Sequence, residues 1–279
     1  MLILATFYQI FMRVAVYIGK NETEHECGLD EMLSRIEKGG IQYYMVDAQE
    51  GVQENTDMVL SVGGDGTFLS VSKLVADSGI PVVGVNRGRL GFLSENRPED
   101  VADALLTGDY TIEDRTLLSA EVEGEENQFI ALNEVTVHRS GAAVVSVDVC
   151  LDGKWLPTYW ADGLIVSTSS GSTAYSLSVG GPIVLPESKV LLISPIAPHN
   201  LNIRPLVVPD NAKILLRLQS RDGKFVFTAD NVTLDLFEDI QIAVSVAQFS
   251  LRRVRLNKSD FINALTEKLY WGEDVRNLK

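Results

Sequence analysis

Residues 58–76 read MVLSVGGDGTFLSVSKLVA, and the order of residue types in this stretch decides the class of fold. The apolar run 58–62 has the length of a buried strand, glycines interrupt it at 63–64, and 68–76 is typical of a helix. Glycine lets the backbone approach an anion closely, and the first turn of a helix offers unpaired N–H groups with a partial positive charge. Because phosphates bind at such helix starts, the stretch predicts a phosphate loop.

The surrounding sequence alternates strands and helices as a parallel α/β sheet does. Together with 58–76, the predicted elements follow the order β-α-β-β-α-β, which indicates a Rossmann-like α/β domain over residues 1–110. The other predicted strands are 13–18, 41–46 and 81–85, and the other predicted helices are 28–38 and 98–106.

The character of the sequence changes near residue 110. Helical spacing fades, and β-rich runs follow one another, separated by turn signals such as Asp152-Gly153 and Asp222-Gly223. This pattern predicts a largely antiparallel β domain over residues 111–255. Its predicted strands are 117–122, 129–138, 143–151, 163–168, 190–195, 213–218, 224–229 and 240–247.

Both ends of the chain carry segments that need a separate explanation. Residues 1–11 are apolar, but they lack the basic start and cleavage site of a signal peptide and are too short to span a bilayer. We expect Met12 to be the true start; the alternative is an extra strand or an interface segment. In the tail, 256–279, residues 259–271 predict a helix, which we expect to pack back on the N-terminal domain.

The composition narrows the class of function. The 279 residues are 46% hydrophobic, which is enough for one large core or two medium ones, and the length favours two domains. A formal net charge of −14 makes nucleic acid a poor partner, because contact with its backbone needs a basic face. Two cysteines are too few for a disulfide framework, and no stretch reaches membrane length, so we expect a soluble, cytoplasmic protein without a membrane partner.

Asp65, at the centre of the glycine loop, does not suit a pure anion site, because a carboxylate repels phosphate. It suits a site where it accepts the proton of a hydroxyl nucleophile or holds a cation. The structural alternative is that Asp65 is only the N-cap of the helix. The loop has neither the Gly-Lys-Ser/Thr ending of a P-loop nor the spacing of GxGxxG, so those two nucleotide sites lose their main support.

The GGDGT sequence of the loop resembles the superfamily of NAD kinases, diacylglycerol and sphingosine kinases, and 6-phosphofructokinases. These enzymes transfer a nucleotide's terminal phosphate to a hydroxyl group. Residues 86–94, NRGRLGFLS, resemble a segment of NAD kinases, and the sequence lacks the GTGND element usual in lipid kinases. Asn133-Glu134, within the apolar run ALNEVTV, is similar to the Asn-Glu motif with which NAD kinases bind the adenosine part of NAD.

The most specific resemblance lies in residues 162–178, DGLIVSTSSGSTAYSLS, followed by Gly180-Gly181-Pro182. These residues are similar to the signature of NAD kinases, in which a hydroxyl-rich turn precedes a helix. Ser169 stands where the family commonly has Pro, and we expect the loss of the proline ring to loosen the turn slightly.

Further resemblance and two further departures lie in the rest of the chain. Residues 195–205, PIAPHNLNIRP, resemble a segment of the family. Val232 stands where members often have Gln and lacks its hydrogen-bonding groups, and Trp160 stands where several members have Arg. From Met12 onward the chain is identified as a member of the NAD kinase family.

The resemblance implies a kinase that uses ATP, or another nucleoside triphosphate, to phosphorylate the 2′-hydroxyl of the adenosine ribose of NAD. It implies a divalent cation, usually magnesium, and a homo-oligomer, either a dimer or a tetramer, with Asp65 as the general base. The residues expected to hold phosphate are Gly63, Gly64, Gly66 and Thr67. The residues expected to position NAD are Asp65, Gly66, Asn133, Glu134, Asp162, Thr173, Ala174, Tyr175 and Ser178. The alternatives are a lipid or sugar kinase of the same superfamily and a non-catalytic dinucleotide sensor.

Overall fold

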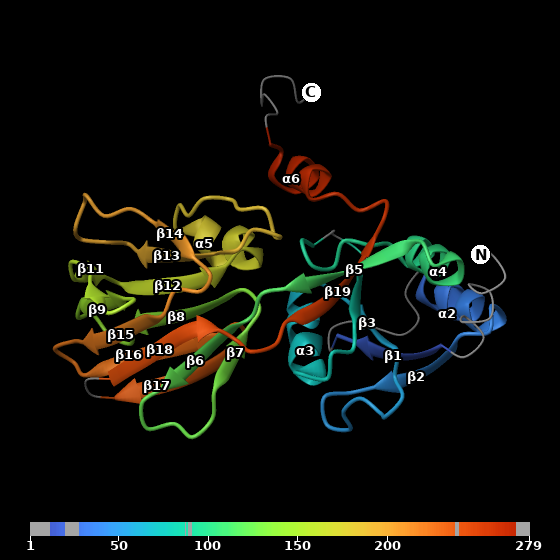
Figure 1. Ribbon diagram of the computed structural model, residues 1–279, viewed down its shortest axis with the longest axis horizontal. Coiled ribbons are helices and arrows are strands. Elements are labelled where there is room, and N and C mark those ends of the chain that lie inside the picture. The colour runs from blue at the N-terminus through green and yellow to red at the C-terminus, as the bar shows by residue number, and fades with distance from the viewer. Residues whose placement is uncertain (1–11, 20–27, 87, 89–90, 238–239, 272–279) are drawn as a thin grey trace. The chain divides into compact units, whose positions relative to one another are not determined.

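The computed structural model describes residues 12–19, 28–86, 88, 91–237 and 240–271 (Figure 1). The chain divides into two compact units. The first comprises Met1–Asp114 and Leu251–Lys279, and the second comprises Arg115–Ser250. The boundaries expected after residues 110 and 255 fall inside two strands, β5 and β19, of the first unit's sheet. Residues 1–11, on which the expectation of a start at Met12 rests, lie outside the described residues.

The first unit is built on a six-stranded sheet in which both ends of the sequence take part. The strand order is β2-β1-β3-β4-β19-β5, and the pairs β1/β2, β1/β3, β3/β4 and β4/β19 are parallel. The pattern of apolar runs predicted β1 to β4, but neither β5 nor β19. The bounds are Arg13–Ile18 for β1, Gln42–Val46 for β2, Met58–Val62 for β3, Val82–Val85 for β4, Leu251–Leu256 for β19 and Tyr110–Arg115 for β5.

Four helices accompany this sheet in the described part of the first unit, close to their predicted positions. α2 (Leu29–Lys38) buries four apolar residues along one face and contacts α4 (Pro98–Thr107), as Figure 1 shows. α3 (Asp65–Val75) follows β3 directly and contacts β3 and β4. α6 (Phe261–Leu269) lies within the predicted range 259–271 and begins after Asp260, whose carboxylate caps its first turn.

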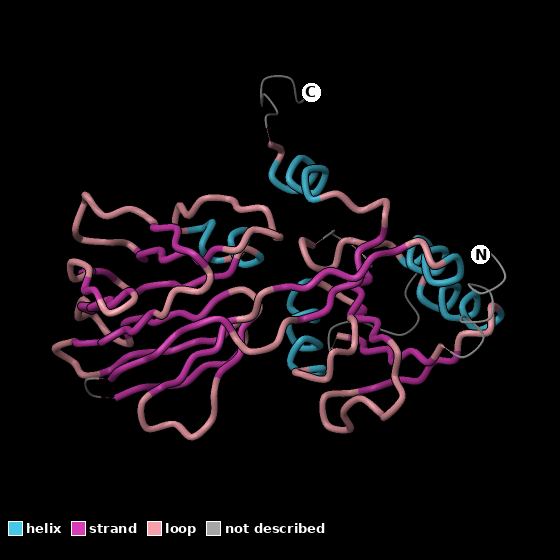
Figure 2. The backbone as a smooth tube through the Cα atoms, in the orientation of Figure 1, coloured by secondary structure: helices cyan, strands magenta, loops and turns pink. Residues whose placement is uncertain are grey.

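The second unit consists of two antiparallel sheets, and helical structure is scarce in it (Figure 2). One sheet has the order β10-β9-β15-β18-β6-β7, with β11 also paired to β9, and the other has the order β14-β13-β12-β8-β16-β17. The strands of the first are β6 Leu118–Val122, β7 Phe129–Ala131, β9 Val145–Leu151, β10 Lys154–Trp155, β11 Tyr159–Ala161, β15 Ile214–Gln219 and β18 Ile240–Val246. Those of the second are β8 Glu134–Arg139, β12 Gly163–Thr168, β13 Val190–Ile196, β14 Leu206–Pro209, β16 Lys224–Ala229 and β17 Val232–Phe237.

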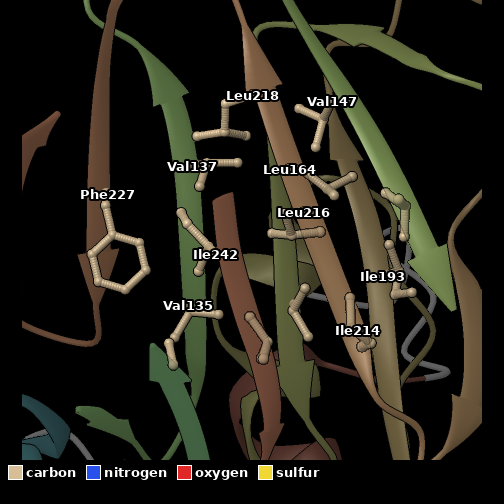
Figure 3. Close-up of a cluster of buried hydrophobic side chains, with 14 of the residues drawn as sticks. Val135, Val137, Val147, Leu164, Ile193, Ile214, Leu216, Leu218, Phe227 and Ile242 are labelled. Atoms are coloured by element: carbon tan, nitrogen blue, oxygen red, sulfur yellow. The ribbon is translucent and has the colours of Figure 1, made fainter. Parts of the chain in front are cut away.

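The two sheets share one apolar core (Figure 3). Val135 and Val137 of β8 and Leu164 of β12 lie in the same buried cluster as Ile214 and Leu216 of β15. Because successive side chains of a strand point to opposite faces, every second residue of β8 enters this core and the others face away from it. The predicted combination of an α/β domain and a largely antiparallel β domain is confirmed.

Two short helical segments follow β12. They are the 3₁₀ helix η1 (Ser170–Thr173) and α5 (Tyr175–Ser178), which together form the hydroxyl-rich signature. The run 129–138, predicted as one strand, is divided into β7 and β8, because the backbone at 132–133 leaves the ladder between them. None of the helices in the described part of the chain is long and apolar enough to cross a membrane.

Candidate functional site

The glycine loop joins β3 to α3, and its geometry requires glycine at the first position. Gly63 has a φ of +146°, which L side chains rarely adopt, and a Cβ atom there would lie 2.4 Å from Oγ1 of Thr67. Gly64 and Gly66 are exposed, and a Cβ atom on either would meet no heavy atom within 4 Å. The loop therefore leaves open space around the first turn of α3, as a phosphate site requires.

The side chain of Asp65 turns away from its own helix and binds another backbone segment. Oδ2 accepts the N–H of Phe92 at 2.8 Å, and Oδ1 accepts the N–H groups of Leu93 at 3.0 Å and Ser94 at 2.9 Å. The N-cap of α3 is Gly64, without a side-chain capping bond. The alternative that Asp65 is the N-cap of its helix is therefore wrong.

These three bonds limit what the Asp65 carboxylate can still accept. An ionised carboxylate has about four acceptor positions, two on each oxygen. Oδ1 uses two of them and Oδ2 uses one. Among the contacts of the described residues, one position on Oδ2 is left for a ligand, and the bonds to the backbone fix its direction.

Gly91 makes this close approach possible. A Cβ atom on Gly91 would lie 1.8 Å from Oδ1 of Asp65, so any other residue there would displace the carboxylate. Glycine is therefore required at position 91 for a steric reason, which the sequence alone did not reveal. Arg87 and Arg89 of the same segment lie outside the described residues.

A lysine of α6 lies close to this carboxylate. Nζ of Lys268 is 4.1 Å from the centroid of the Phe92 ring and has no hydrogen-bond partner within the described part of the chain. Burial lowers the pKa of Lys268, while the negative charges of Asp65 and Glu95 act in the opposite direction. A desolvated cation is therefore held near the loop.

In the second unit, the predicted site residues gather around the face of the second sheet that points away from the core. Val135 and Val137 are in the core, so Glu134, Thr136 and His138 of the same strand lie on the other face. Both η1 and α5 contact the neighbouring strand β12. The polar side of β8 and the hydroxyl-rich signature thus belong to one region.

Asn133 and Glu134 lie at the break between β7 and β8, where Asp230 holds the backbone. Oδ2 of Asp230 accepts the N–H of Leu132 at 2.7 Å, and Oδ1 accepts those of Asn133 at 3.0 Å and Glu134 at 3.1 Å. The arrangement is the same as that of Asp65, with one carboxylate binding three successive N–H groups. It fixes the backbone from which the Asn133 and Glu134 side chains project.

Glu134 is a buried acid whose Oε2 has no hydrogen-bond partner among the described residues. Burial, and after it the negative charge of Asp230, raises the pKa of Glu134 to about 8, against a lowering by the backbone N–H of Tyr175. At neutral pH this side chain is therefore mainly protonated. A protonated carboxyl group can donate a hydrogen bond as well as accept one.

The hydroxyl-rich signature is tied to Asn133 and reaches along β8. The N–H of Thr168 donates to the carbonyl of Asn133 at 2.9 Å. The Tyr175 ring stacks on His138, with centroids 5.6 Å apart and planes 14° apart. Thr173, Ala174 and Tyr175 are half-buried, whereas Ser178 is exposed at the end of α5.

Asp162 lies at the opposite end of β12 from Thr168 and is engaged with Arg139. The pair is bidentate, with Nε–Oδ1 at 2.9 Å and Nη2–Oδ2 at 3.2 Å. Gly163, the next residue, pairs with His138, on which the Tyr175 ring stacks. Asp162 therefore lies at the opposite end of the β8/β12 strand pair from Asn133 and Glu134. The Tyr175–His138 stack lies on this strand pair, between the two ends.

Of the three departures from the family pattern, one has a clear structural consequence. The hydroxyl of Ser169 donates to the carbonyl of Pro186 at 2.8 Å, and its φ of −58° is one that Pro would also adopt. This hydrogen bond replaces part of the restraint that a proline ring would supply. Val232 is the first residue of β17, opposite Ala229, and Trp160 is exposed on β11.

A divalent cation fits this loop only together with the phosphates of a substrate. No group of three or more His, Cys, Asp or Glu side chains among the described residues is arranged to hold a metal ion. Magnesium in kinase sites is typically bound through one or two carboxylates together with substrate phosphates and water, rather than by a cage of protein ligands. Because Asp65 keeps only one acceptor position beside its bonds to the described residues, a cation here would be held by the substrate phosphates and water, which leaves that position for a hydroxyl group.

Comparisons with known proteins identify the family of the chain. Residues 2–110 match the ATP-NAD kinase N-terminal domain, and residues 132–256 match the ATP-NAD kinase C-terminal domain. The NAD kinase of Flavobacterium psychrophilum is 41% identical over 243 residues, which cover 84% of this chain and 83% of the relative.

Two solved structures are similar in fold. The first is yeast NADH kinase in complex with NADH, with a TM-score of 0.83 and 22% identity, covering 96% of this chain and 90% of that one. The second is an NAD kinase from Archaeoglobus fulgidus in complex with ATP, with a TM-score of 0.73 and 26% identity, covering 88% and 95%. Both domain matches and the identity to a curated relative lead to the same conclusion: the chain belongs to the NAD kinase family.

Proposed function

We propose that the chain transfers the terminal phosphate of ATP to the 2′-hydroxyl of the adenosine ribose of NAD, giving NADP and ADP. Membership of the NAD kinase family supports this reaction. The observation that carries it is the fixed carboxylate of Asp65 at the start of α3, with one acceptor position left on Oδ2. A lipid or sugar kinase of the same superfamily finds no comparable support.

In the proposed reaction, the first turn of α3 binds the triphosphate. Gly63, Gly64, Gly66 and Thr67 line the turn, and the two exposed glycines leave room for phosphate oxygens beside backbone N–H groups. A divalent cation bound with the triphosphate supplies positive charge to the phosphate oxygens when it is present. We take magnesium as its identity, as in the family generally.

Asp65 acts as the general base. Its free position on Oδ2 accepts the proton of the 2′-hydroxyl while the hydroxyl oxygen forms a bond to the terminal phosphorus. The bond from that phosphorus to the bridging oxygen breaks, and ADP leaves with the electron pair. A positioned base is typically worth about 10²- to 10⁴-fold in rate, and alignment of the two substrates supplies much of the rest.

The polar region of the second unit binds the dinucleotide. Asn133 and the protonated Glu134 offer both donors and acceptors, which suits ribose hydroxyls. Tyr175 offers an aromatic surface, and Thr173 and Ala174 offer short side chains beside backbone N–H groups. Asp162, whose pair with Arg139 secures the end of β12, and Ser178, which is exposed at the end of α5, complete the proposed set of NAD-binding residues.

The purified chain should form NADP from NAD in the presence of ATP and magnesium, measured with an NADP-specific dehydrogenase. Asp65→Ala should remove most of this activity, whereas Asp77→Ala, an exposed aspartate just after α3, should retain it. NADH and other triphosphates as substrates establish the preferences, and size-exclusion chromatography with light scattering tests the proposed homo-oligomer. A folded protein that forms no NADP above the no-enzyme background would refute the proposal.

A further inference from the structure

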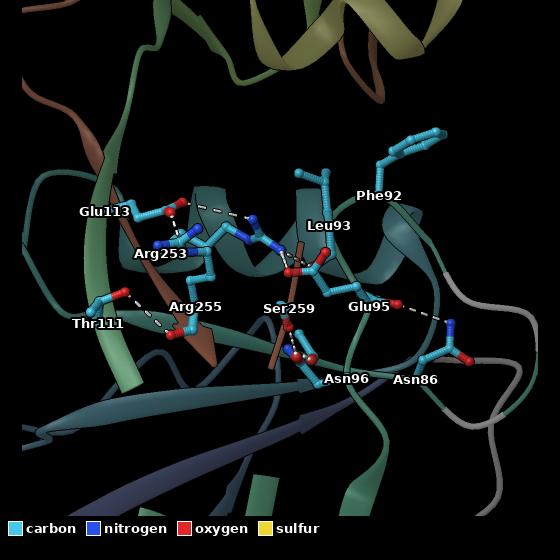
Figure 4. Close-up of polar contacts among 12 residues, drawn as sticks. Asn86, Phe92, Leu93, Glu95, Asn96, Thr111, Glu113, Arg253, Arg255 and Ser259 are labelled. Atoms are coloured by element: carbon cyan, nitrogen blue, oxygen red, sulfur yellow. Dashed lines mark hydrogen bonds and ion pairs between the residues drawn. The ribbon is translucent and has the colours of Figure 1, made fainter. Parts of the chain in front are cut away.

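Arg253 is a buried cation of β19 that contacts the segment holding Asp65. It is 4% exposed, and its Nη2 lies 2.5 Å from Oε1 of Glu95 and 3.5 Å from the carbonyl oxygen of Leu93 (Figure 4). Its Nη1 lies 3.9 Å from Oε2 of Glu113. Its Nε–H is buried without a partner among the described residues, so the position of the guanidinium does not satisfy all of its hydrogen-bond donors.

One peptide group connects Arg253 to Asp65. The carbonyl of Leu93 and the N–H of Ser94 belong to the same peptide unit. Arg253 donates to the carbonyl at 3.5 Å, and the N–H donates to Oδ1 of Asp65 at 2.9 Å. A cation at the carbonyl end polarises the peptide and strengthens its N–H as a donor, as in other chains of hydrogen bonds.

Backbone and side-chain hydrogen bonds hold both ends of the segment 86–96, so Arg253 acts on the middle of this segment. The N–H of Asn86 donates to the carbonyl of Asn96 at 2.7 Å, and the side-chain amide of Asn96 donates to the carbonyl of Gly84 at 2.9 Å. The ion pair with Glu95 and the contact with Leu93 lie between these fixed points. They are the contacts by which β19, from the distant end of the sequence, reaches the 92–95 backbone.

We infer that Arg253 is a positioning residue for Asp65: through Glu95 and the peptide 93–94 it sets where the carboxylate stands. It does so without touching either substrate. This inference rests on the proposed role of Asp65 in phosphoryl transfer. A misplacement on the order of 1 Å at a reacting group can cost about 10²-fold in rate, so loss of this contact should appear in kcat.

The test uses the full chain and a variant that leaves no unpaired carboxylate, Arg253→Met/Glu95→Gln. We expect a folded protein by circular dichroism, a kcat lower by about 10²-fold, and KM values for NAD and ATP changed by less than about threefold. Hydrogen exchange at the amides of Phe92, Leu93 and Ser94, read by mass spectrometry or NMR, should accelerate by about tenfold or more, because these N–H groups lose their fixed acceptor.

Two single variants separate positioning from general stability. Arg255→Met removes an exposed cation of the same strand, whose ion pair is with Glu113 at 2.6 Å, and it should behave like the wild type. Arg253→Lys keeps a positive charge beside Glu95 but lacks the planar guanidinium. Its melting temperature should therefore equal that of the wild type, while its kcat should stay about tenfold below the wild-type value.

The exchange measurement does not depend on turnover, so it tests the inference even if the wild type forms no NADP. Wild-type kcat and wild-type amide protection in Arg253→Met/Glu95→Gln would overturn the inference. The same is true if Arg255→Met lowers kcat equally, or if Arg253→Lys recovers kcat together with the melting temperature. Each of these results would assign Arg253 to the stability of the first unit alone.

Discussion

Replacing Glu134 with Gln should make the stability of the second unit less dependent on pH. Burial and Asp230 raise the pKa of Glu134 from 4.5 to about 8. The folded protein therefore holds this proton more tightly than the unfolded chain does. Its contribution to stability is fully present below about pH 4.5 and is lost as the pH rises through about 8. Gln has the shape of the protonated acid but no proton to lose.

The size of the effect follows from the two pKa values. The difference of about 3.5 units corresponds to about 5 kcal/mol over the whole range, at about 1.4 kcal/mol per unit. Between pH 6 and pH 8 the wild type should lose about 2 kcal/mol relative to Glu134→Gln. For a unit of this size that corresponds to a change of about 4–8 °C in the difference between their melting temperatures.

Thermal unfolding followed by circular dichroism at pH 6, 7 and 8 measures this difference. Glu126→Gln, which removes an exposed carboxylate of the same unit, is the matched control and should follow the wild type across the range. Parallel curves for the wild type and Glu134→Gln would falsify the assignment of a proton to Glu134 at neutral pH.

The other predictions concern the loop carboxylate, the cation beside it and the dinucleotide region. Gly91→Ala places a Cβ atom 1.8 Å from Oδ1 of Asp65 and should lower kcat by about 10²-fold, whereas Gly88→Ala, whose Cβ meets nothing within 4 Å, should not; equal activities would contradict the steric argument. Lys268→Met should raise the melting temperature at pH 7, because burial lowers the pKa of this lysine and the charged form is therefore disfavoured in the folded protein; an unchanged or lower melting temperature counts against that reasoning. Tyr175→Ala should raise KM for NAD with little change in melting temperature, since the ring is half-buried, and the reverse result would make it a core residue.

The elements with a strong local pattern could be predicted from the sequence. β1, β3 and β4 are short apolar runs, and α2 shows an apolar face at helical spacing, so each lies within a residue or two of its expected position. α3 starts three residues earlier than expected, at Asp65, because glycines adopt helical geometry when the loop requires it. The hydroxyl-rich signature could be located from its residues. Its helical part, however, consists only of η1 and a single turn of α5, and not of a longer helix.

The parts that could not be predicted depend on contacts between distant residues. β19 has the sequence of a surface strand, with exposed Arg252 and Arg255, and nothing local assigns it to the first sheet. Asp230 stands in a hairpin turn, which is a sufficient local reason for an aspartate, yet its carboxylate holds a backbone about 100 residues away. Both are long-range interactions without a periodic signal.

The three backbone N–H groups that bind Asp65 also change how a substitution of this residue must be interpreted. Asn is close to Asp in shape, which suggests a harmless replacement. Its amide group, however, would set a donor against at least one of the N–H groups of Phe92, Leu93 or Ser94, where the carboxylate now accepts. Asp65→Asn therefore perturbs the loop as well as the proton acceptor, and its loss of activity cannot be assigned to either alone.

The ribosome delivers the parts of the first unit at two widely separated times. β5 is made early, but its neighbour in the sheet, β19, emerges only after all of Arg115–Ser250 has been synthesised. The second unit is continuous and can complete its two sheets while the first still lacks a strand. A released chain truncated after residue 250, which lacks β19, should contain a protease-resistant second unit and a protease-sensitive first unit, and equal resistance of both would contradict this order. The half of the enzyme that is translated first is thus the half that must wait for the release of the chain to become native.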